Sequence, residues 1–194
     1  GSMFIKDGFI FKIRENIFNF LYKIIFSHPN LKVILQNKDD FKYLIQKCNL
    51  QKGKVEIIKG SGVNLKEFKF SAIPQGLPVI TMVSRIIKDK GVIEFVKSAY
   101  FLKKKKFKGK FFLIGDVDYE NPSAVKKYLI QKWKDEKVIK LINYKNKINK
   151  YIKKSSIIVL PSYREGFPKI LIEASASARP IITTNVPGCR DAII

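Results

Sequence analysis

Two short segments carry side chains whose types and spacing could bind a ligand. The first, Ser84 to Gly91, has Arg85 near its start and Lys90 near its end. A guanidinium and an ammonium that converge from one turn can neutralise a diphosphate, because arginine offers a fork of donors and lysine a point charge. With 38 basic residues among 194, however, this segment alone favours an ordinary solvated turn, and a diphosphate clamp is the alternative.

The second segment places two glutamates, Glu165 and Glu173, eight residues apart. A helix predicted to begin near Phe167 puts Glu173 in its second turn and Glu165 on the loop before it. The N–H groups of Gly166 and Phe167 would then be free to face a ligand, and Gly166 has no side chain to block its approach. Carboxylates accept hydrogen bonds from the vicinal hydroxyls that ribose and hexose present. An ordinary charged helix face is the alternative for this pair.

Both segments are expected to follow strands of a parallel sheet. From residue 79 onward short apolar strands alternate with helices, which predicts an α/β fold: a Rossmann-like parallel sheet with helices on both faces. Such sheets bind ligands at the carboxyl ends of their strands. The predicted strands are Val79–Val83, Gly109–Ile114, Val138–Ile142, Ile157–Leu160 and Pro180–Thr184, and the predicted helices are Val92–Lys103, Ser123–Lys134, Ile148–Lys153 and Pro168–Ala178.

The chain before residue 76 has a different pattern. Apolar residues recur at three- and four-residue steps from Phe4 to Phe26, which predicts a helix that is apolar around most of its circumference. A helix of this kind must be covered on several sides. A strand, a helix and a second strand are predicted to follow at Leu31–Leu35, Asp39–Cys48 and Val55–Ile58. The expected division is therefore between residues 4–75 and 76–194.

The segment PSYREGFPKILIEASASARPIITTNVPGCRD resembles the signature of the family-4 retaining glycosyltransferases of the GT-B fold. Upstream, TMVSRIIKDKGVIEF resembles the diphosphate-binding strand and loop of that family, and FFLIGDVDYENPSAV resembles its second strand and turn. VILQNKDD and IIKGSGVNLKEF are similar to the last strands of the N-terminal domain and the approach to the linker. The resemblance implies a C-terminal, donor-binding domain, truncated at its C-terminus and preceded by a remnant of the acceptor-side domain.

The resemblance also implies a role for each candidate residue. Arg85 and Lys90 would clamp the donor diphosphate as it leaves, Glu165 would contact the donor sugar, and Glu173 would hold the ribose hydroxyls. Arg85, Lys90 and Glu165 form the implied catalytic set. Two positions depart from the family pattern: Ser84 replaces a frequent glycine, and Asn143, where the family contacts the base, also stands for a glycine. The implied nucleotide-sugar-binding set is Ser84, Arg85, Lys90, Asn143, Tyr144, Glu165, Gly166, Phe167, Pro168 and Glu173.

The implied activity is retaining transfer of a hexose or N-acetylhexosamine from a nucleotide sugar, expected to be UDP-linked. The acceptor would be a lipid-linked glycan or a polysaccharide, in the synthesis of bacterial capsule or lipopolysaccharide. No cofactor or catalytic metal is expected, and Cys48 and Cys189 lie in no metal-ligand spacing and are interpreted as reduced thiols. Because both domains would be incomplete, we expect this chain to be inactive by itself.

The formal net charge of +22 has several interpretations. Only five of the 38 basic residues are arginine, so a lysine-rich composition with solvated side chains is favoured. Attraction to anionic lipid or lipid-linked phosphate is the second interpretation, with residues 4–26 lying in the headgroup region. The apolar face of that helix is expected to be either exposed or buried by self-association. Nucleic acid is not an expected partner, because no recognised binding motif accompanies the charge. The expected location is cytoplasmic, peripheral at the inner membrane face, and a non-catalytic sugar-nucleotide-binding domain is the remaining alternative.

Overall fold

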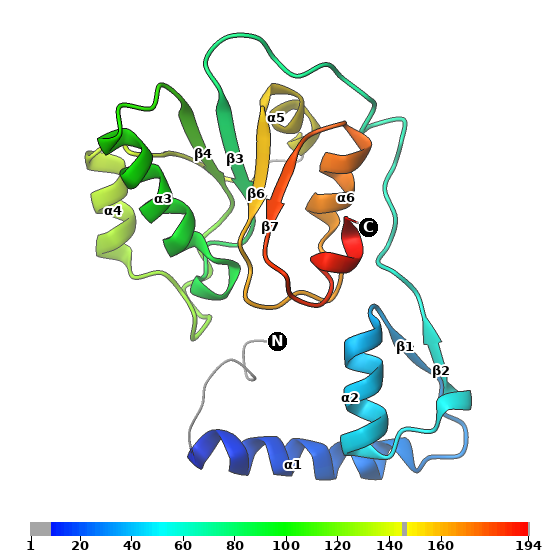
Figure 1. The fold of residues 1–194 in the computed structure, drawn as a ribbon. Coiled ribbons are helices and arrows are strands. Elements are labelled where there is room, and N and C mark those ends of the chain that lie inside the picture. Colours follow the sequence, from blue (N-terminus) through cyan, green and yellow to red (C-terminus); the bar gives the residue numbers. More distant parts are fainter. Residues whose placement is uncertain (1–8, 145–146, 194) are drawn as a thin grey trace.

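The computed structural model describes residues 9–144 and 147–193, with side chains from residue 12 onward. The described chain forms two units, each with a sheet of its own (Figure 1). The first unit contains helices α1 (Phe9–Phe26) and α2 (Lys38–Cys48) and the parallel strands β1 (Val33–Leu35) and β2 (Val55–Ile57). These elements are the ones predicted, although residues 4–8 of the predicted first helix lie outside the described residues.

The second unit is built on a five-stranded sheet in which every neighbouring pair is parallel. Its order, β5-β4-β3-β6-β7, runs one way from β3 to β5 and the other way from β3 to β7. The predicted α/β class with a parallel sheet is confirmed, and the reversal between β3 and β6 is where open sheets of this kind leave a ligand crevice. The elements are β3 (Val79–Val83), α3 (Val92–Lys104), β4 (Lys110–Ile114), α4 (Lys127–Asp135), β5 (Lys140–Ile142), α5 (Ile148–Lys154), β6 (Ile157–Leu160), α6 (Lys169–Ala176) and β7 (Ile181–Thr183).

Helices cover both faces of the five-stranded sheet (Figure 1). Met82 of β3 packs with Phe95 of α3 and Trp133 of α4 on one face. The next residue, Val83, packs with Ile152 of α5 on the other face, because successive side chains of a strand point to opposite sides. Burial on both faces fixes the strands, and with them the loops at their carboxyl ends.

Helix α4 begins at Lys127, not at the predicted Ser123. The segment before it pairs with the loop after β3: the backbone N–H of Lys88 donates to the carbonyl of Ser123 at 2.7 Å, and Ile87 forms a β-bridge with Ala124. Those groups are not available to a helix. A tertiary contact therefore overrides the local helical pattern at this boundary.

The linker between the units packs on the second unit. Phe68 is 5% exposed and belongs to the core that contains Val83. The buried guanidinium of Arg179 donates to the carbonyl oxygens of Ser71 and Ala72 at 2.9 and 3.0 Å. Linker residues that precede the boundary expected at residue 76 therefore pack on the second unit. An isolated phenylalanine in a loop gave no periodic signal.

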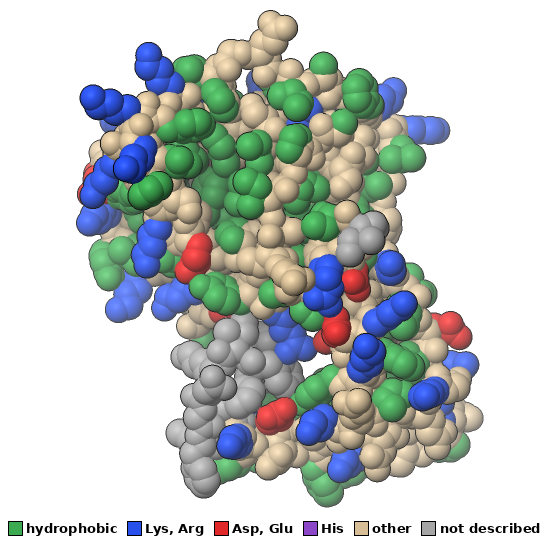
Figure 2. All heavy atoms as spheres, viewed as in Figure 1, with side chains coloured by type: hydrophobic (Ala, Val, Ile, Leu, Met, Phe, Trp, Pro, Cys, Tyr) green, Lys and Arg blue, Asp and Glu red, His purple; other side chains and the backbone are tan. Residues whose placement is uncertain are grey.

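Helix α1 contacts the rest of the first unit along part of its surface only. Its Phe26 packs with Cys48 and Leu50, and the hydroxyl of Tyr43 donates to Glu15 at 2.8 Å. Six other apolar residues of α1, each 45–62% exposed, are Ile13, Ile17, Phe20, Leu21, Ile24 and Ile25. In the part of the chain that the structure describes, no helix combines the length and apolar content needed to cross a bilayer. On the face drawn in Figure 2, lysine and arginine side chains are spread over both units.

Candidate nucleotide-sugar site

A cavity of about 420 Å³ opens at the carboxyl ends of β3, β4 and β5. Four of the predicted site residues line it, although they come from three separate stretches of sequence. The lining includes Ser84, Arg85, Asp116, Tyr144, Lys169 and Glu173. The structure thus brings Arg85 and Glu173 to the same cavity, as the predicted site requires.

Arg85 lies two residues after β3 and reaches into solvent. Its Nη1 lies 3.1 Å from Oδ2 of Asp118, and its side chain is 60% exposed. An exposed ion pair of this kind contributes at most about 1 kcal/mol, because water screens both charges. An anionic ligand can therefore displace Asp118 at little cost.

Glu173, in contrast to Arg85, is largely buried. Its side chain is 11% exposed, and Nζ of Lys169, one helical turn earlier, lies 3.7 Å from its Oε1. Loss of hydration raises the pKa of the Glu173 carboxyl, and the charge of Lys169 opposes that effect only in part. A carboxylate that has lost water and has one loose cationic partner is a good acceptor for hydroxyl donors on a ligand.

Lys90 and Glu165 contact each other outside that cavity. Nζ of Lys90 lies 2.7 Å from Oε1 of Glu165, and the hydroxyl of Ser162 donates to the same oxygen at 2.7 Å. The two charged side chains are 19% and 11% exposed. The residues predicted to hold the diphosphate and the donor sugar are therefore paired with each other.

Close packing of two loops makes that pairing possible. Gly91, which ends the loop after β3, has a φ of +74° and its Cα faces the carbonyl of Pro161, so a Cβ there would collide with it. The backbone N–H of Tyr163 donates to the carbonyl of Asp89 at 3.0 Å, and its hydroxyl donates to Glu94 at 2.8 Å. Because β3 and β6 are neighbours at the reversal of the sheet, their loops meet.

Asn143 does not line the cavity that contains Arg85 and Glu173. It lines a different cavity, together with Phe112 and Tyr151. Its neighbour Tyr144 does line the 420 Å³ cavity and donates its backbone N–H to Oδ1 of Asp116 at 3.1 Å. Of these two predicted residues, the structure therefore brings only Tyr144 to Arg85 and Glu173.

Two amides just before the N-cap of α6 have no hydrogen-bond partner among the described residues. Pro168 is the N-cap residue, and the N–H groups of Gly166 and Phe167 make no hydrogen bond to any residue in 9–144 or 147–193. The ring of Phe167 packs against Gly60 of the linker. These amides lie immediately after Glu165, so they are available beside the Lys90–Glu165 pair.

The sequence profile described as "Glycosyl transferases group 1" matches residues 63–194. This chain belongs to that family. It is 31% identical over 206 residues to the N,N'-diacetylbacillosaminyl-diphospho-undecaprenol alpha-1,3-N-acetylgalactosaminyltransferase of Campylobacter jejuni, covering 100% of this chain and 52% of that protein. It is 27% identical over 198 residues to the capsular polysaccharide biosynthesis glycosyltransferase CapM of Staphylococcus aureus, covering 93% and 52%. The chain thus spans about half the length of the curated relatives it matches.

Solved structures of GT-B glycosyltransferases share the fold of this group 1 chain. HepE of Anabaena in complex with UDP-glucose superposes with a TM-score of 0.71 at 17% identity, covering 89% of this chain and 50% of that one. WaaG, a glycosyltransferase involved in lipopolysaccharide biosynthesis, gives a TM-score of 0.69 at 16% identity, covering 84% and 46%. At these identities the likeness shows the fold alone.

Residue type and position in a loop did not identify every residue of the candidate site. Asp116 and Lys169 line the cavity, and Asp116 comes two residues after β4, so the strand-end rule that selected Arg85 also applies to it. Ser162, which holds Glu165, carried no signal beyond lying in the same loop. Within the described residues, no group of three or more His, Cys, Asp or Glu side chains is arranged to hold a metal ion, and both cysteines are buried free thiols.

Proposed function

We propose that this chain forms the donor-binding part of a family-4 retaining glycosyltransferase, its C-terminal domain with a remnant of the acceptor-side domain. The enzyme transfers a hexose or N-acetylhexosamine from a UDP-sugar to a lipid-linked or polysaccharide acceptor, at the inner face of the cytoplasmic membrane. The observation that carries the proposal is that Arg85 and Glu173 line one cavity while Lys90 and Glu165 meet at the adjoining reversal of the sheet. The names of two relatives support the acceptor class, since both specify a diphospho-undecaprenol glycan.

Arg85 and Lys90 stabilise the diphosphate as it leaves. Negative charge develops on that group when the bond to the anomeric carbon breaks, and cations already fixed in place need no reorganisation to stabilise it. Removing one such group typically costs about 10²–10³-fold in rate. Arg85 has only an exposed ion-pair partner, so it is ready to bind the diphosphate. Lys90 has a close, largely buried partner and must leave Glu165 to reach the diphosphate.

Glu173 binds the ribose and Glu165 the donor sugar. The dehydrated carboxylate of Glu173 lies across the same cavity as Arg85, so a nucleoside diphosphate reaches both with its ribose and its phosphates. Ser84 and Tyr144 line that cavity. Pro168 is the N-cap residue of α6, and the amides of Gly166 and Phe167 just before it bind the sugar and phosphate. We also retain Asn143 as a candidate at the base end, on the family pattern.

The test is calorimetric titration of the purified chain with UDP, GDP, ADP and their sugars. We expect UDP and its sugars to bind best, and Arg85→Ala to lose most of that binding. Lys88→Ala is the matched control, since it removes one positive charge from an exposed residue of the same loop. Equal and feeble heats for every nucleotide, or the same loss in both variants, would remove the assignment.

Peripheral membrane contact is a second function of the same protein. The exposed apolar face of α1 carries Lys12, Arg14 and Lys23 beside it, which suits the boundary between anionic headgroups and acyl chains. Co-sedimentation with vesicles of phosphatidylglycerol and phosphatidylcholine, with and without residues 4–26, tests it. Binding that survives removal of the helix would argue against this contact, and a doubled mass in light scattering without vesicles would assign the face to self-association.

A further inference from the structure

Asn37 of the first unit caps helix α2 and also bonds to the second unit. It is 1% exposed, and its Oδ1 accepts the backbone N–H of Asp40 at 2.8 Å, which caps the start of α2. Its Nδ2 donates twice: to Oδ2 of Asp40 at 2.9 Å and to the carbonyl oxygen of Gly166 at 3.1 Å. The last bond joins residues 129 positions apart, in different units.

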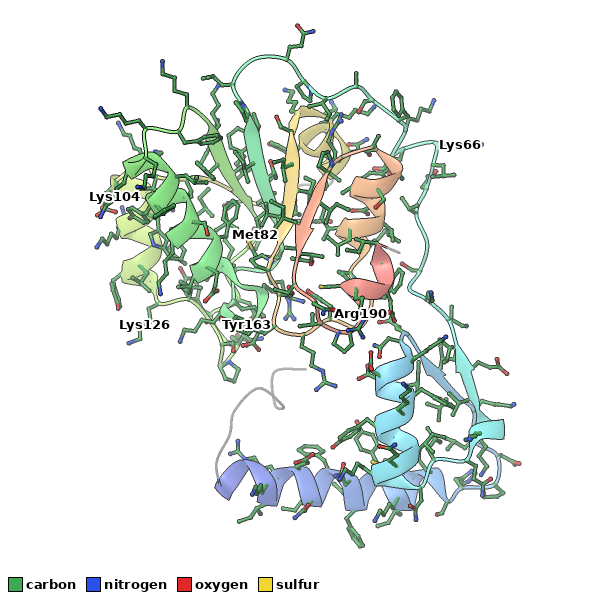
Figure 3. All side chains as sticks on the ribbon, in the orientation of Figure 1. Lys66, Met82, Lys104, Lys126, Tyr163 and Arg190 are labelled. Atoms are coloured by element: carbon green, nitrogen blue, oxygen red, sulfur yellow. The ribbon has the colours of Figure 1, made fainter. Side chains whose placement is uncertain are left out.

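Two ion pairs hold the first turn of α2 in the same place. Oδ1 of Asp40 lies 3.1 Å from Nη2 of Arg164, and Oδ2 of Asp39 lies 2.7 Å from Nη2 of Arg190. Figure 3 shows Arg190 at the lower edge of the second unit, close to the upper end of α2. Arginine holds carboxylates with a rigid fork, so two of the five arginines in this lysine-rich chain serve this junction. The contact between Asn37 and Gly166 is thus part of an organised interface.

The hydrogen bond to the Gly166 carbonyl also fixes the direction of the Phe167 N–H, which belongs to the same peptide group. In a trans peptide the carbonyl of one residue and the N–H of the next point in opposite directions. Because Asn37 holds the Gly166 carbonyl toward α2, the N–H of Phe167 points away from α2. Oε1 of Gln36 occupies the place that a Cβ of residue 166 would take, so glycine allows this close approach.

We propose that Asn37 is a positioning residue of the donor site, acting through the Gly166–Phe167 peptide. This inference rests on the proposed function, in which the Phe167 amide faces the sugar and phosphate of the donor. The first unit thereby contributes to donor binding without touching the donor. Asn37 aims the amide, and the two ion pairs keep Asn37 in register with the loop that carries Glu165.

The test compares Asn37→Ser with the parent chain by calorimetry, using UMP and UDP-N-acetylgalactosamine. Serine keeps an N-cap oxygen for α2 but has no amide donor for Gly166. We expect affinity for UDP-N-acetylgalactosamine to fall about tenfold, the value of one hydrogen bond of about 1.4 kcal/mol, while UMP affinity stays within about twofold. Asn30→Ser is the control: it makes the same substitution at an exposed residue before β1, leaves the Asn37 bond and both ion pairs intact, and should leave the ratio of the two affinities unchanged.

Two outcomes separate this inference from the proposed function. A parent chain that binds neither nucleotide removes the function itself, whereas a parent that binds both and a variant with the same affinity ratio overturn only the role of Asn37. If Asn37→Ser does not fold, backbone amide NMR on the parent chain still tests whether the Phe167 amide responds to the donor sugar. The Phe167 N–H resonance should move on addition of UDP-N-acetylgalactosamine and not of UMP; equal movement with both, or none with either despite calorimetric binding, contradicts the inference.

Discussion

Lys90 and Glu165 lie 75 residues apart in sequence, yet Nζ of the first is 2.7 Å from Oε1 of the second. Each charge neutralises the other, and the hydroxyl of Ser162 donates to the same glutamate oxygen. A diphosphate that approaches Lys90 therefore competes with a carboxylate already in position. In the proposed function, the donor diphosphate must break this contact to reach Lys90.

Replacing Glu165 should release Lys90 for phosphate. In Glu165→Gln the ammonium loses its charged partner, so UDP should bind about threefold to tenfold more tightly, the value of a partly buried ion pair of about 0.7–1.4 kcal/mol. Calorimetry with UDP measures this directly. Tighter UDP binding should accompany weaker preference for a UDP-sugar over UDP, and an unchanged or weaker UDP affinity would contradict the competition.

Glu173 should show opposite effects on stability and binding. Burial raises the pKa of its carboxyl. Protonated Glu173 therefore contributes to folding stability in full below the ordinary glutamate pKa of about 4.3. That contribution is lost as the pH rises through the raised pKa of the folded state. Glu173→Gln, which cannot ionise, should therefore raise the melting temperature at pH 8 by a few degrees and change it little at pH 4. Thermal unfolding at the two pH values measures this.

The same variant should bind UDP less well. Glutamine offers a neutral acceptor in place of a charged one, and the ribose hydroxyls lose about tenfold in affinity as a result. A loss of stability at pH 8, or an undiminished affinity for UDP, would argue that Glu173 serves the packing of α6 and not the ligand.

Gly91→Ala should disturb the loop contact that brings Lys90 to Glu165. The new Cβ collides with the carbonyl of Pro161 and also meets the cost of a left-handed backbone, about 1–2 kcal/mol. Gly62→Ala is the control, since Gly62 has a φ of +72° and no atom within 4 Å of its missing Cβ. Denaturant unfolding should show a loss for Gly91→Ala that exceeds that of the control by at least about 1 kcal/mol. Equal losses would mean that only backbone strain matters.

Arg179→Lys should destabilise the second unit despite conserving the charge. Lysine cannot reach the carbonyls of Ser71, Ala72 and Ile152 together, so buried acceptors lose their donors. We expect a loss of about 3 kcal/mol in the free energy of unfolding. Lys153→Arg, on the neighbouring exposed surface, serves as the control and should be neutral; a comparable loss there would mean that substitution anywhere in this region is damaging.

The local pattern was sufficient for most of the secondary structure and for part of the site. Strands β3 and β6 have the predicted bounds, because short apolar runs between polar turns define buried parallel strands clearly. The predicted start of α4 was wrong, since the residues before Lys127 pair with the loop that carries Arg85. Phe68 likewise gave no periodic signal, and the other buried members of its core begin at Val83 and extend to Ala174.

The sequence by itself determined the α/β class, the strands and the loops at their carboxyl ends that carry Arg85, Lys90, Glu165 and Glu173. Those features follow from local periodicity and from the chemistry of each side chain. Only the tertiary structure decided which of them meet. The order of the strands puts β3 beside β6 and so pairs Lys90 with Glu165, and the docking of α2 brings Asn37 to Gly166. Such contacts depend on packing between distant segments, which no local pattern encodes.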